Sequence, residues 1–305
     1  MTIAVLIPTY HRQQCLVRCL DALKRQSRIP DEVLVVVRDA DAETKALLEG
    51  CEFASSTLRV VTVIVPGVVA ALNAGLEAAR ADIIAITDDD AVPRPDWLAR
   101  INTHFRADPK VGGVGGRDWL HYDGKVDDGA RKVVGRVQWF GRVIGNHHLG
   151  VGGPRRVDVL KGVNCAYRRT VLQCIGFDER LLGTGAQVHW ELGLGLQLRR
   201  AGWKLIYDPA VAVDHYPASR FGEDQRDRYE WTNAAYNETL SLLEYLTPMR
   251  RLVFIIWAVL VGTRSSPGLL QWLRVLPREG RLAGKNLRAA LTGRIEALNM
   301  WRRSR

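Results

Sequence analysis

The sequence predicts an α/β fold in which a mostly parallel sheet is covered by helices on both faces. Four short segments near the N-terminus are apolar at successive positions instead of alternating with polar residues. This pattern is typical of strands buried on both faces, as they are in parallel sheets. Helical spacing of apolar residues at 13–26 and 67–81 supplies the alternation of strand and helix. The expected strands are residues 3–7, 31–37, 59–66 and 82–87.

The rest of the body is predicted to be less regular. Residues 112–156 are rich in glycine, charged and aromatic residues, which favours loops and short strands that form a recognition surface. A strand, a helix and a turn are expected over 159–181, followed by a helix and a strand pair over 187–220. Leucines alternate from Leu192 to Leu198 as in a strand, but the basic residues and glycine that follow are typical of a helix C-terminus. A helix is therefore predicted there.

The net charge of the chain is concentrated at its C-terminal end. The 305 residues carry a formal net charge of +10, and 47% of them are hydrophobic, which is enough for one large domain with an appendage. Residues 246–305 contain twelve Lys or Arg and only two acids, Glu279 and Glu296, so the preceding residues are formally neutral. The sequence therefore predicts a neutral body and a basic tail, which need separate explanations.

Cysteine usage favours a reducing compartment, and the apolar segments favour neither a signal peptide nor a membrane span. The five cysteines form no Cys-x-x-Cys pair, so neither a zinc knuckle nor a redox dithiol is predicted, and an intracellular location is expected. The first twelve residues are expected to form a strand rather than a signal peptide. The longest apolar run, 252–262, has eleven residues, well short of the ~20 that span a bilayer.

Three adjacent aspartates follow the predicted strand at 82–87, at the sheet edge where α/β proteins bind ligands. One interpretation of Asp88, Asp89 and Asp90 is a solvated turn that caps the helix expected near Asp96. The other is a divalent-cation site, because Mg²⁺ and Mn²⁺ prefer carboxylate and phosphate oxygens and a cation offsets the repulsion between carboxylates. Asp88 and Asp90 are two positions apart, so an extended chain points both to one side.

Several motifs, in this order and spacing, give the chain a family resemblance. They are "IAVLIPTYHR", "PDEVLVVV", "LNAGL", "IIAITDDDAVPRPDWL", "GFDERL" and "LRRAGWKLIYDPAVAVDH". Over about residues 1–240 the chain resembles the family 2 glycosyltransferases of the GT-A fold. The resemblance implies a Rossmann-like domain with a nucleotide-binding half, 1–110, and an acceptor-binding half, 111–240, before a basic helical tail, 241–305. It also implies a nucleoside-diphosphate sugar donor, Mn²⁺ or Mg²⁺ as cofactor, and a single displacement that inverts the anomeric centre.

The resemblance places two segments of the first half against the nucleotide. The loop after the first strand is expected to lie against the base and ribose. Its candidate residues are Pro8, Thr9, Tyr10 and Arg12. In this family an acidic residue after the second strand reads the base, but here Val37 and Arg38 stand where the acids are common. Asp39 or Asp41 is therefore expected to serve, with UDP as the expected nucleotide.

The same resemblance assigns roles to the triplet and to one asparagine. Asn73 lies in "ALNAG", where Leu72 replaces the arginine that is usual in the family, and remains a candidate on the nucleotide side. Asp88 and Asp89 are expected on the ribose and diphosphate side. Asp90 is expected to be the direct metal ligand.

Four residues of the second half complete the site that the resemblance implies. Glu191 occupies the position of the general base, which would take the proton of the acceptor hydroxyl. Without the resemblance it is a surface residue in the first turn of a helix, stabilised by the helix dipole. Trp190 stacks on an acceptor sugar or packs in the core. His215 matches a third metal ligand of related enzymes, and Arg220 is a weaker candidate for contact with the leaving diphosphate.

The basic tail has two interpretations. Apolar residues, tryptophans and basic residues are interleaved at roughly helical spacing, which is typical of an interfacial helix on anionic lipid. The alternative is a pair of helices that pack on the domain or on a second copy of the chain as a homodimer. Nucleic acid is set aside because no nucleic-acid-binding fold accompanies the tail. A peripheral position on the inner, cytoplasmic face of the cytoplasmic membrane would suit a polyprenyl-linked acceptor, with a glycan as the other candidate.

Two other functions compete with a glycosyltransferase. A nucleotidyltransferase on a similar fold would need a glycine-rich phosphate loop after the first strand, and "PTYHRQQC" has no glycine. A degenerate protein that binds sugar nucleotides or glycans without turnover is compatible with the changes at Val37, Arg38 and Leu72. The presence of Asp88, Asp90 and Glu191 argues against it.

Overall fold

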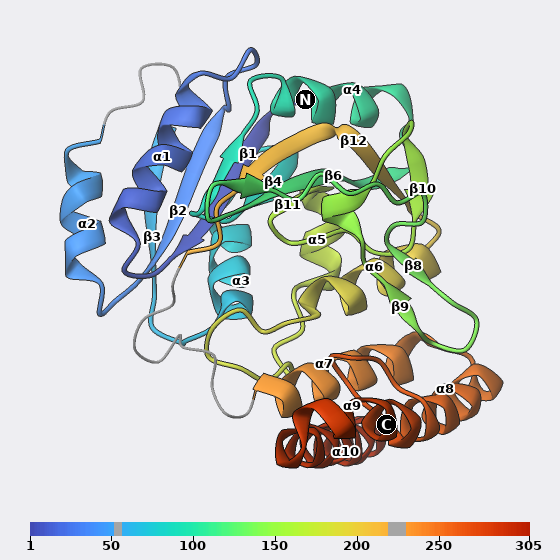
Figure 1. Cartoon of the computed structure of the whole chain (residues 1–305). Coiled ribbons are helices and arrows are strands. Elements are labelled where there is room, and N and C mark those ends of the chain that lie inside the picture. The colour runs from blue at the N-terminus through green and yellow to red at the C-terminus, as the bar shows by residue number, and fades with distance from the viewer. Residues whose placement is uncertain (52–56, 219–229) are drawn as a thin grey trace.

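The computed structural model of the chain describes residues 1–51, 57–218 and 230–305 (Figure 1). In order, the strands are β1 Ile3–Thr9, β2 Glu32–Arg38, β3 Thr57–Val63, β4 Ile83–Thr87, β5 Ala91–Pro93, β6 Val111–Tyr122, β7 Lys125–Val126, β8 Arg136–Val137, β9 Val143–Ile144, β10 Arg155–Val157, β11 Asn164–Arg168 and β12 Lys204–His215. The helices are α1 Gln13–Lys24, α2 Ala42–Glu49, α3 Val68–Ala78, α4 Trp97–Ala107, α5 Arg169–Ile175, α6 Trp190–Arg200, α7 Glu230–Tyr245, α8 Pro248–Leu260, α9 Leu269–Glu279 and α10 Arg281–Arg303, with a 3₁₀ turn at His147–Leu149.

The described strands confirm the predicted α/β fold. Ten of them form one sheet in the order β10-β12-β6-β11-β4-β1-β2-β3, with β5 beside β12 and β7 beside β6. Strands β4, β1, β2 and β3 are parallel, as are β6 and β12, while β11 is antiparallel to both of its neighbours. The carboxyl ends of β1, β2 and β4 therefore meet at one edge, which is where the sequence places its polar candidates.

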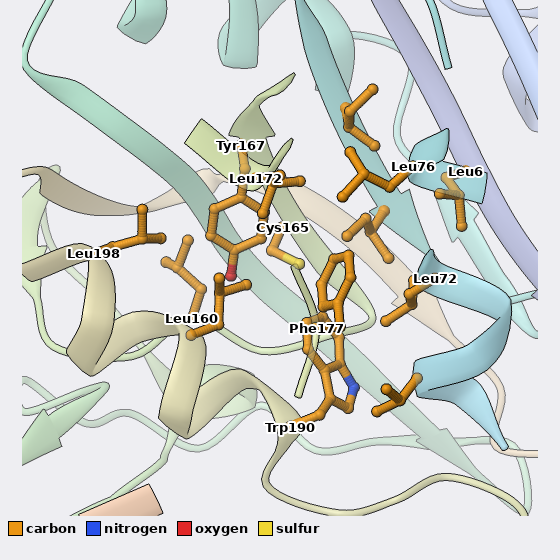
Figure 2. Packing of buried hydrophobic residues seen from close by; sticks show 14 of the residues in the cluster. Leu6, Leu72, Leu76, Leu160, Cys165, Tyr167, Leu172, Phe177, Trp190 and Leu198 are labelled. Atoms are coloured by element: carbon orange, nitrogen blue, oxygen red, sulfur yellow. The ribbon is translucent and has the colours of Figure 1, made fainter. Parts of the chain in front are cut away.

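Two hydrophobic clusters cover the two faces of the sheet. Alternate residues of β1 divide between them: Leu6 joins the cluster with α3, α5 and α6, whereas Val5 joins the cluster with α1 and α4. Figure 2 shows the first cluster, in which Leu6, Leu72 and Leu76 lie beside the aromatic side chains further along the chain. Because both faces are packed, the strands need the continuous apolar pattern that the sequence shows.

The glycine-rich segment differs from its prediction. Loops and short strands were expected, but Val111–Tyr122 is the long central strand β6. Its glycines lower the strand signal in the sequence, yet the packing requires them. A Cβ at Gly116 would lie 1.7 Å from the carbonyl oxygen of Val211, and one at Gly113 would lie 2.8 Å from the ring of Tyr167. Because these glycines have no side chain, β12 and β11 can lie close to β6. The C-terminal end of β12 is thereby positioned next to the triplet.

The C-terminal helices divide into a packed part and an exposed part. Helix α10 packs on α7, and its residues Ala297, Met300 and Trp301 join the core under the sheet. Helices α8 and α9 leave leucine-rich stripes exposed instead. The boundary expected at residue 240 falls inside α7, so the tail begins within a helix that packs on the body (Figure 1). Among the described residues, none of the helices is both long enough and apolar enough to cross a bilayer.

Candidate active site

The aspartate triplet begins where β4 ends, beside the loop that follows β1. Thr9 Oγ1 donates a hydrogen bond of 2.7 Å to Asp89 Oδ2. Arg12 donates one of 3.1 Å to Asp89 Oδ1 and lies 3.6 Å from Asp90 Oδ2. Asp89 is buried, so these contacts replace the water that it loses. Asp89, expected on the ribose and diphosphate side, thus fixes the β1 loop to the end of β4, and its contact with the donor stays a prediction.

Asp88, Asp90 and His215 form a group that could hold a metal ion. One ligand atom from each lies within 4.8 Å of the other two. His215 comes from the end of β12, where it pairs with Ala91 of β5, directly after the triplet. Asp90 Oδ1 is buried, accepts no hydrogen bond from the described residues, and lies 3.3 Å from His215 Nε2. Two carboxylates and an imidazole are a donor set that suits Mn²⁺ or Mg²⁺, and the unsatisfied oxygen faces the group.

The electrostatics of the triplet also call for a positive charge. Burial, together with the charge of Asp90, raises the pKa of Asp88, and burial raises the pKa of Asp89. Burial acts against ionisation of Asp90 too, but His215 holds the pKa of that carboxyl below its ordinary value. Burial alone would lower the pKa of His215, but the carboxylates of Asp90 and Asp118 beside it outweigh burial and raise that pKa to about 9. A proton on His215 balances the carboxylates here, and a metal bound at the same atom would release it.

Glu191 faces the triplet from the first turn of α6. Its Oε1 accepts a hydrogen bond of 2.9 Å from the backbone N–H of Gly162. A Cβ on Gly162 would lie 3.0 Å from that oxygen and 2.6 Å from the ring of Trp190, so the close approach needs glycine. The charge of Glu191 contributes to the raised pKa of Asp88, which shows that the two carboxylates share one electrostatic environment. This position confirms the predicted helix and leaves the role of base open to experiment.

One cavity of about 1120 Å³ joins most of the predicted residues. Its walls come from the β1 loop, the triplet, the N-terminal ends of α3 and α6, and the end of β12. The predicted residues that line it are Pro8, Thr9, Tyr10, Arg12, Asp88, Asp89, Asp90, Trp190, Glu191 and His215. Residues as far apart in the sequence as Pro8 and His215 therefore meet at one sheet edge, as the order of the strands requires.

Three predicted nucleotide ligands lie outside the lining of this cavity. Asp41 is buried and caps α2, where it accepts hydrogen bonds from the backbone and side chain of Thr44 and from the N–H of His11. Asn73 exchanges two hydrogen bonds with the backbone of Phe177, at 3.0 and 2.9 Å. Asp39 is exposed after β2. Asp41 and Asn73 therefore have structural roles, and nucleotide contact stays a prediction for all three.

Trp190 lies mostly in the core. Figure 2 shows it beside Phe177, and the two rings meet edge to face with centroids 5.3 Å apart. Only 7% of the residue is exposed, so the packing interpretation accounts for most of its surface. Stacking on an acceptor sugar stays a prediction for the part that lines the cavity. Arg220, the weaker candidate for the diphosphate, lies outside the described residues.

Sequence reasoning missed two groups in the cavity. Lys161 lines it and forms an ion pair with the buried carboxylate of Asp118, which lies 3.7 Å from His215 Nδ1. Asp118 belongs to β6, and recognising that strand would have placed it at the ligand edge. Arg38 was noted only as a replacement for an acid, but its guanidinium lies over the ring of Tyr10, 5.5 Å from the centroid, and lines the cavity.

Comparisons with known proteins agree on one family and one fold. The profile of the family described as "Glycosyltransferase like family 2" matches residues 2–234. The chain is 25% identical over 296 residues to the glycosyltransferase AglE of Haloferax volcanii, covering 96% of this chain and 90% of that one. It is 24% identical over 226 residues to the glucosyl-dolichyl phosphate glucuronosyltransferase of the same organism, covering 70% and 69%.

Solved structures show the same fold at lower identity. The mannosyltransferase PcManGT of Pyrobaculum calidifontis, in complex with GDP-Man and Mn²⁺, matches with a TM-score of 0.53 and 20% identity, covering 98% of this chain and 74% of that one. The structure of GalNAc-T7 with UDP, GalNAc and Mn²⁺ matches with a TM-score of 0.67 and 14% identity, covering 95% and 54%. Both likenesses concern the fold alone.

Proposed function

Since the chain belongs to the glycosyltransferase-like family 2 and is a glycosyltransferase, we propose that it uses a divalent metal and inverts the anomeric centre of its donor sugar. The donor is a nucleoside-diphosphate sugar, and the acceptor is a hydroxyl of a glycan or of a lipid-linked saccharide. The observation that carries this proposal is the placement of the Asp88, Asp90 and His215 group and of Glu191 in one cavity.

Asp90 and His215 would hold the metal, with Asp88 toward the nucleotide. A bound Mn²⁺ or Mg²⁺ supplies positive charge that stabilises the departing diphosphate. The fit rests on the buried, unsatisfied Oδ1 of Asp90 and on the donor set around it. The complexes with Mn²⁺ among proteins of the same fold support the choice of cation.

Glu191 is proposed to act on the acceptor. Its carboxylate accepts the proton of the acceptor hydroxyl while that oxygen forms a bond to the anomeric carbon. The bond from the anomeric carbon to the diphosphate breaks in the same step, and the nucleoside diphosphate leaves with the bonding electrons. Attack opposite to the leaving group inverts the centre. The hydrogen bond from Gly162 holds one carboxylate oxygen in place for this role.

Tyr10 and Arg38 are proposed to hold the base end of the donor. The two side chains stack on each other at the wall that the β1 loop and β2 form. Arg38 offers only hydrogen-bond donors, so it selects for the acceptor atoms of a base rather than for an N–H group. UDP remains the proposed nucleotide, with GDP and dTDP as the alternatives to compare.

A peripheral place on an anionic membrane, at the inner face of the cytoplasmic membrane, is proposed for α8 and α9. On α8, Met249, Leu252 and Ile256 are exposed on one face. On α9, Leu270 and Leu273 are exposed, and none of its residues is buried. An amphipathic helix whose apolar side faces outward, with arginines beside it, suits a lipid interface. The relative named for a dolichyl phosphate substrate supports a lipid-linked acceptor.

The proposal is tested by nucleotide release from sugar nucleotides of UDP, GDP and dTDP, with Mn²⁺, with Mg²⁺ and with EDTA. Release from at least one donor is expected with metal and not with EDTA. Asp90→Ala is expected to lower metal-dependent release by at least about a hundredfold, since a direct ligand is lost. Asp96→Ala, which removes a half-exposed carboxylate at the N-terminus of α4, is the control. Equal release with EDTA and with Mn²⁺ would refute metal dependence.

A further inference from the structure

A further cavity adjoins the catalytic one and is strongly basic. It has a volume of about 670 Å³ and lies between the turn that joins β8 to β9, the end of α8, the loop 262–268 and α9. The arginines that line it are Arg142, Arg264, Arg274 and Arg278, and the only acid in its lining is Glu279. We call it the basic cavity. Four guanidinium groups around one hollow create a site for an anion.

The arginines of the basic cavity are free to bind a ligand. Among the described residues, none of the four makes a side-chain hydrogen bond or ion pair. Other arginines of the tail are used by the fold: Arg250 donates to the carbonyl oxygens of Trp139 and Gln138, and Arg251 donates to that of Leu243. The contrast separates structural arginines from a cluster whose charge the chain does not neutralise.

The basic cavity is continuous with the catalytic cavity. Arg142 and Thr263 line both of them. Ser265, in the same loop as Thr263, also lines the catalytic cavity. A ligand in the basic cavity therefore borders the space in which Glu191 meets its acceptor, on the side formed by the C-terminal helices (Figure 1).

Contacts within the chain hold the walls of the basic cavity in place. Buried Arg294 of α10 donates to the carbonyl oxygens of Pro267 and Ser266, at 2.8 and 2.6 Å, and so holds the loop 262–268. The rings of Phe140 and Trp257 contact each other with centroids 5.2 Å apart. A preformed cavity loses less entropy on binding than a mobile one, and its aromatic wall can contact an apolar chain.

We propose that the basic cavity binds the phosphate group of a lipid-linked acceptor and thereby positions the saccharide of that acceptor at Glu191. The proposal rests on the proposed function, because it assigns the acceptor class of the same reaction. Arginine pairs with phosphate through two parallel hydrogen bonds, so Arg274 and Arg278, one helical turn apart on α9, are the main anchors. The exposed leucines of α8 and α9 lie on the same helices and would meet the lipid.

The test measures binding of geranylgeranyl phosphate to the full chain in detergent, without any donor. The change in tryptophan fluorescence reports binding, since Trp257 lines the cavity. R274Q/R278Q is expected to bind at least about tenfold more weakly, as expected for two lost charged hydrogen bonds. R302Q/R303Q removes the same charge from the end of α10, where neither residue lines a cavity, and is expected to bind within about twofold of wild type. Geranylgeraniol, which has no phosphate, is expected to bind at least about tenfold more weakly than geranylgeranyl phosphate.

Three outcomes would overturn the proposal. An equal loss of affinity for geranylgeranyl phosphate in R274Q/R278Q and in R302Q/R303Q would mean that the charge of the tail, rather than this cavity, attracts the lipid. If inorganic phosphate binds as tightly as geranylgeranyl phosphate, the site would be assigned to a free anion. If an equal amount of phosphatidylglycerol displaces geranylgeranyl phosphate, the site would be assigned to bulk membrane lipid. Binding of a sugar nucleotide with Mn²⁺ is measured on the same variants and is expected to be unchanged. Its absence from wild type would refute the proposed function without affecting the lipid measurement.

Discussion

Thr9 and Asp89, eighty residues apart in the chain, are joined by a buried hydrogen bond of 2.7 Å between the hydroxyl and the carboxylate. The bond connects the end of β1 to the end of β4 and so fixes the floor of the catalytic cavity. The middle aspartate of the triplet is thereby a positioning residue between Asp88, proposed to lie toward the nucleotide, and Asp90, proposed to hold the metal.

Thr9→Val is predicted to destabilise the protein. Valine has the same shape but leaves Asp89 Oδ2 without its donor, and an unsatisfied buried acceptor costs about 1–3 kcal/mol. The free energy of unfolding in urea measures the effect. Thr103→Val, which removes an exposed hydroxyl bonded to Ala99 within α4, is the control and is expected to change stability by less than about 0.5 kcal/mol. Equal effects of the two substitutions would contradict a special role for the Thr9 contact.

Gly162→Ala is predicted to impair turnover more than folding. Its Cβ would lie 3.0 Å from Glu191 Oε1 and 2.6 Å from the ring of Trp190, so the first turn of α6 must move. A displacement of about 1 Å at a base lowers kcat by about a hundredfold, while donor binding on the opposite wall persists. Steady-state nucleotide release separates kcat from KM. Gly153→Ala, at an open position, is the control, and an unchanged kcat for Gly162→Ala would contradict the proposed position of the base.

Most of the polypeptide fold could be predicted from the sequence, because buried parallel strands leave a continuous apolar pattern that does not depend on distant contacts. The expectation was wrong for β6, where the glycines that weaken the pattern are required by Tyr167 and by the backbone of β12. That error also hid Asp118, which lies on the same strand.

The site could be predicted where a motif carries the chemistry, and less where a side chain serves the fold. The triplet, Glu191 and His215 meet in one cavity, as their motifs implied. Asp41 and Asn73 have motif positions too, but Asp41 caps a helix and Asn73 bonds to Phe177. The cap of Asp41 is local, since Thr44 lies three residues away, but the bonds to His11 and to Phe177 come from distant parts of the chain and leave no pattern of residue types.

The protein is predicted to lose stability in mild acid because of the buried His147. Burial lowers the pKa of His147 to about 4, and its Nε2 is 3.0 Å from the carbonyl oxygen of Val159, which accepts from the neutral ring. In the unfolded chain the pKa is about 6.5, so the unfolded state binds a proton first as the pH falls. The stabilisation is complete above pH 6.5 and is lost between about pH 6.5 and 4, by about 3 kcal/mol. Urea unfolding across this pH range measures the loss of stability. If the free energy of unfolding of His147→Gln depends on pH as steeply as that of the wild type, the assignment to His147 is contradicted.

The exposed stripe of α8 and α9 predicts lipid binding. Leu252 and Leu273 are 56% and 53% exposed, so L252N/L273N is expected to keep its stability. Each buried leucine contributes about 1.5–3 kcal/mol, and binding to vesicles with phosphatidylglycerol is expected to weaken by at least about a hundredfold. Flotation measures this, with Ile64→Asn, an exposed residue of the loop between β3 and α3, as the control. If the wild type does not bind vesicles but forms a dimer, and L252N/L273N is a monomer, the stripe would instead be assigned to contact with a second copy.

The central claim is that Glu191 removes the proton of the acceptor while the Asp90 and His215 group serves the donor. The most direct measurement compares Glu191→Gln with wild type in two assays, donor binding with Mn²⁺ and the rate of transfer. Donor affinity is predicted to stay within about threefold, and the rate is predicted to fall by about a hundredfold or more, as expected when a general base is lost. Glu77→Gln, an exposed glutamate of α3, is the control. Full transfer activity of Glu191→Gln would contradict the claim.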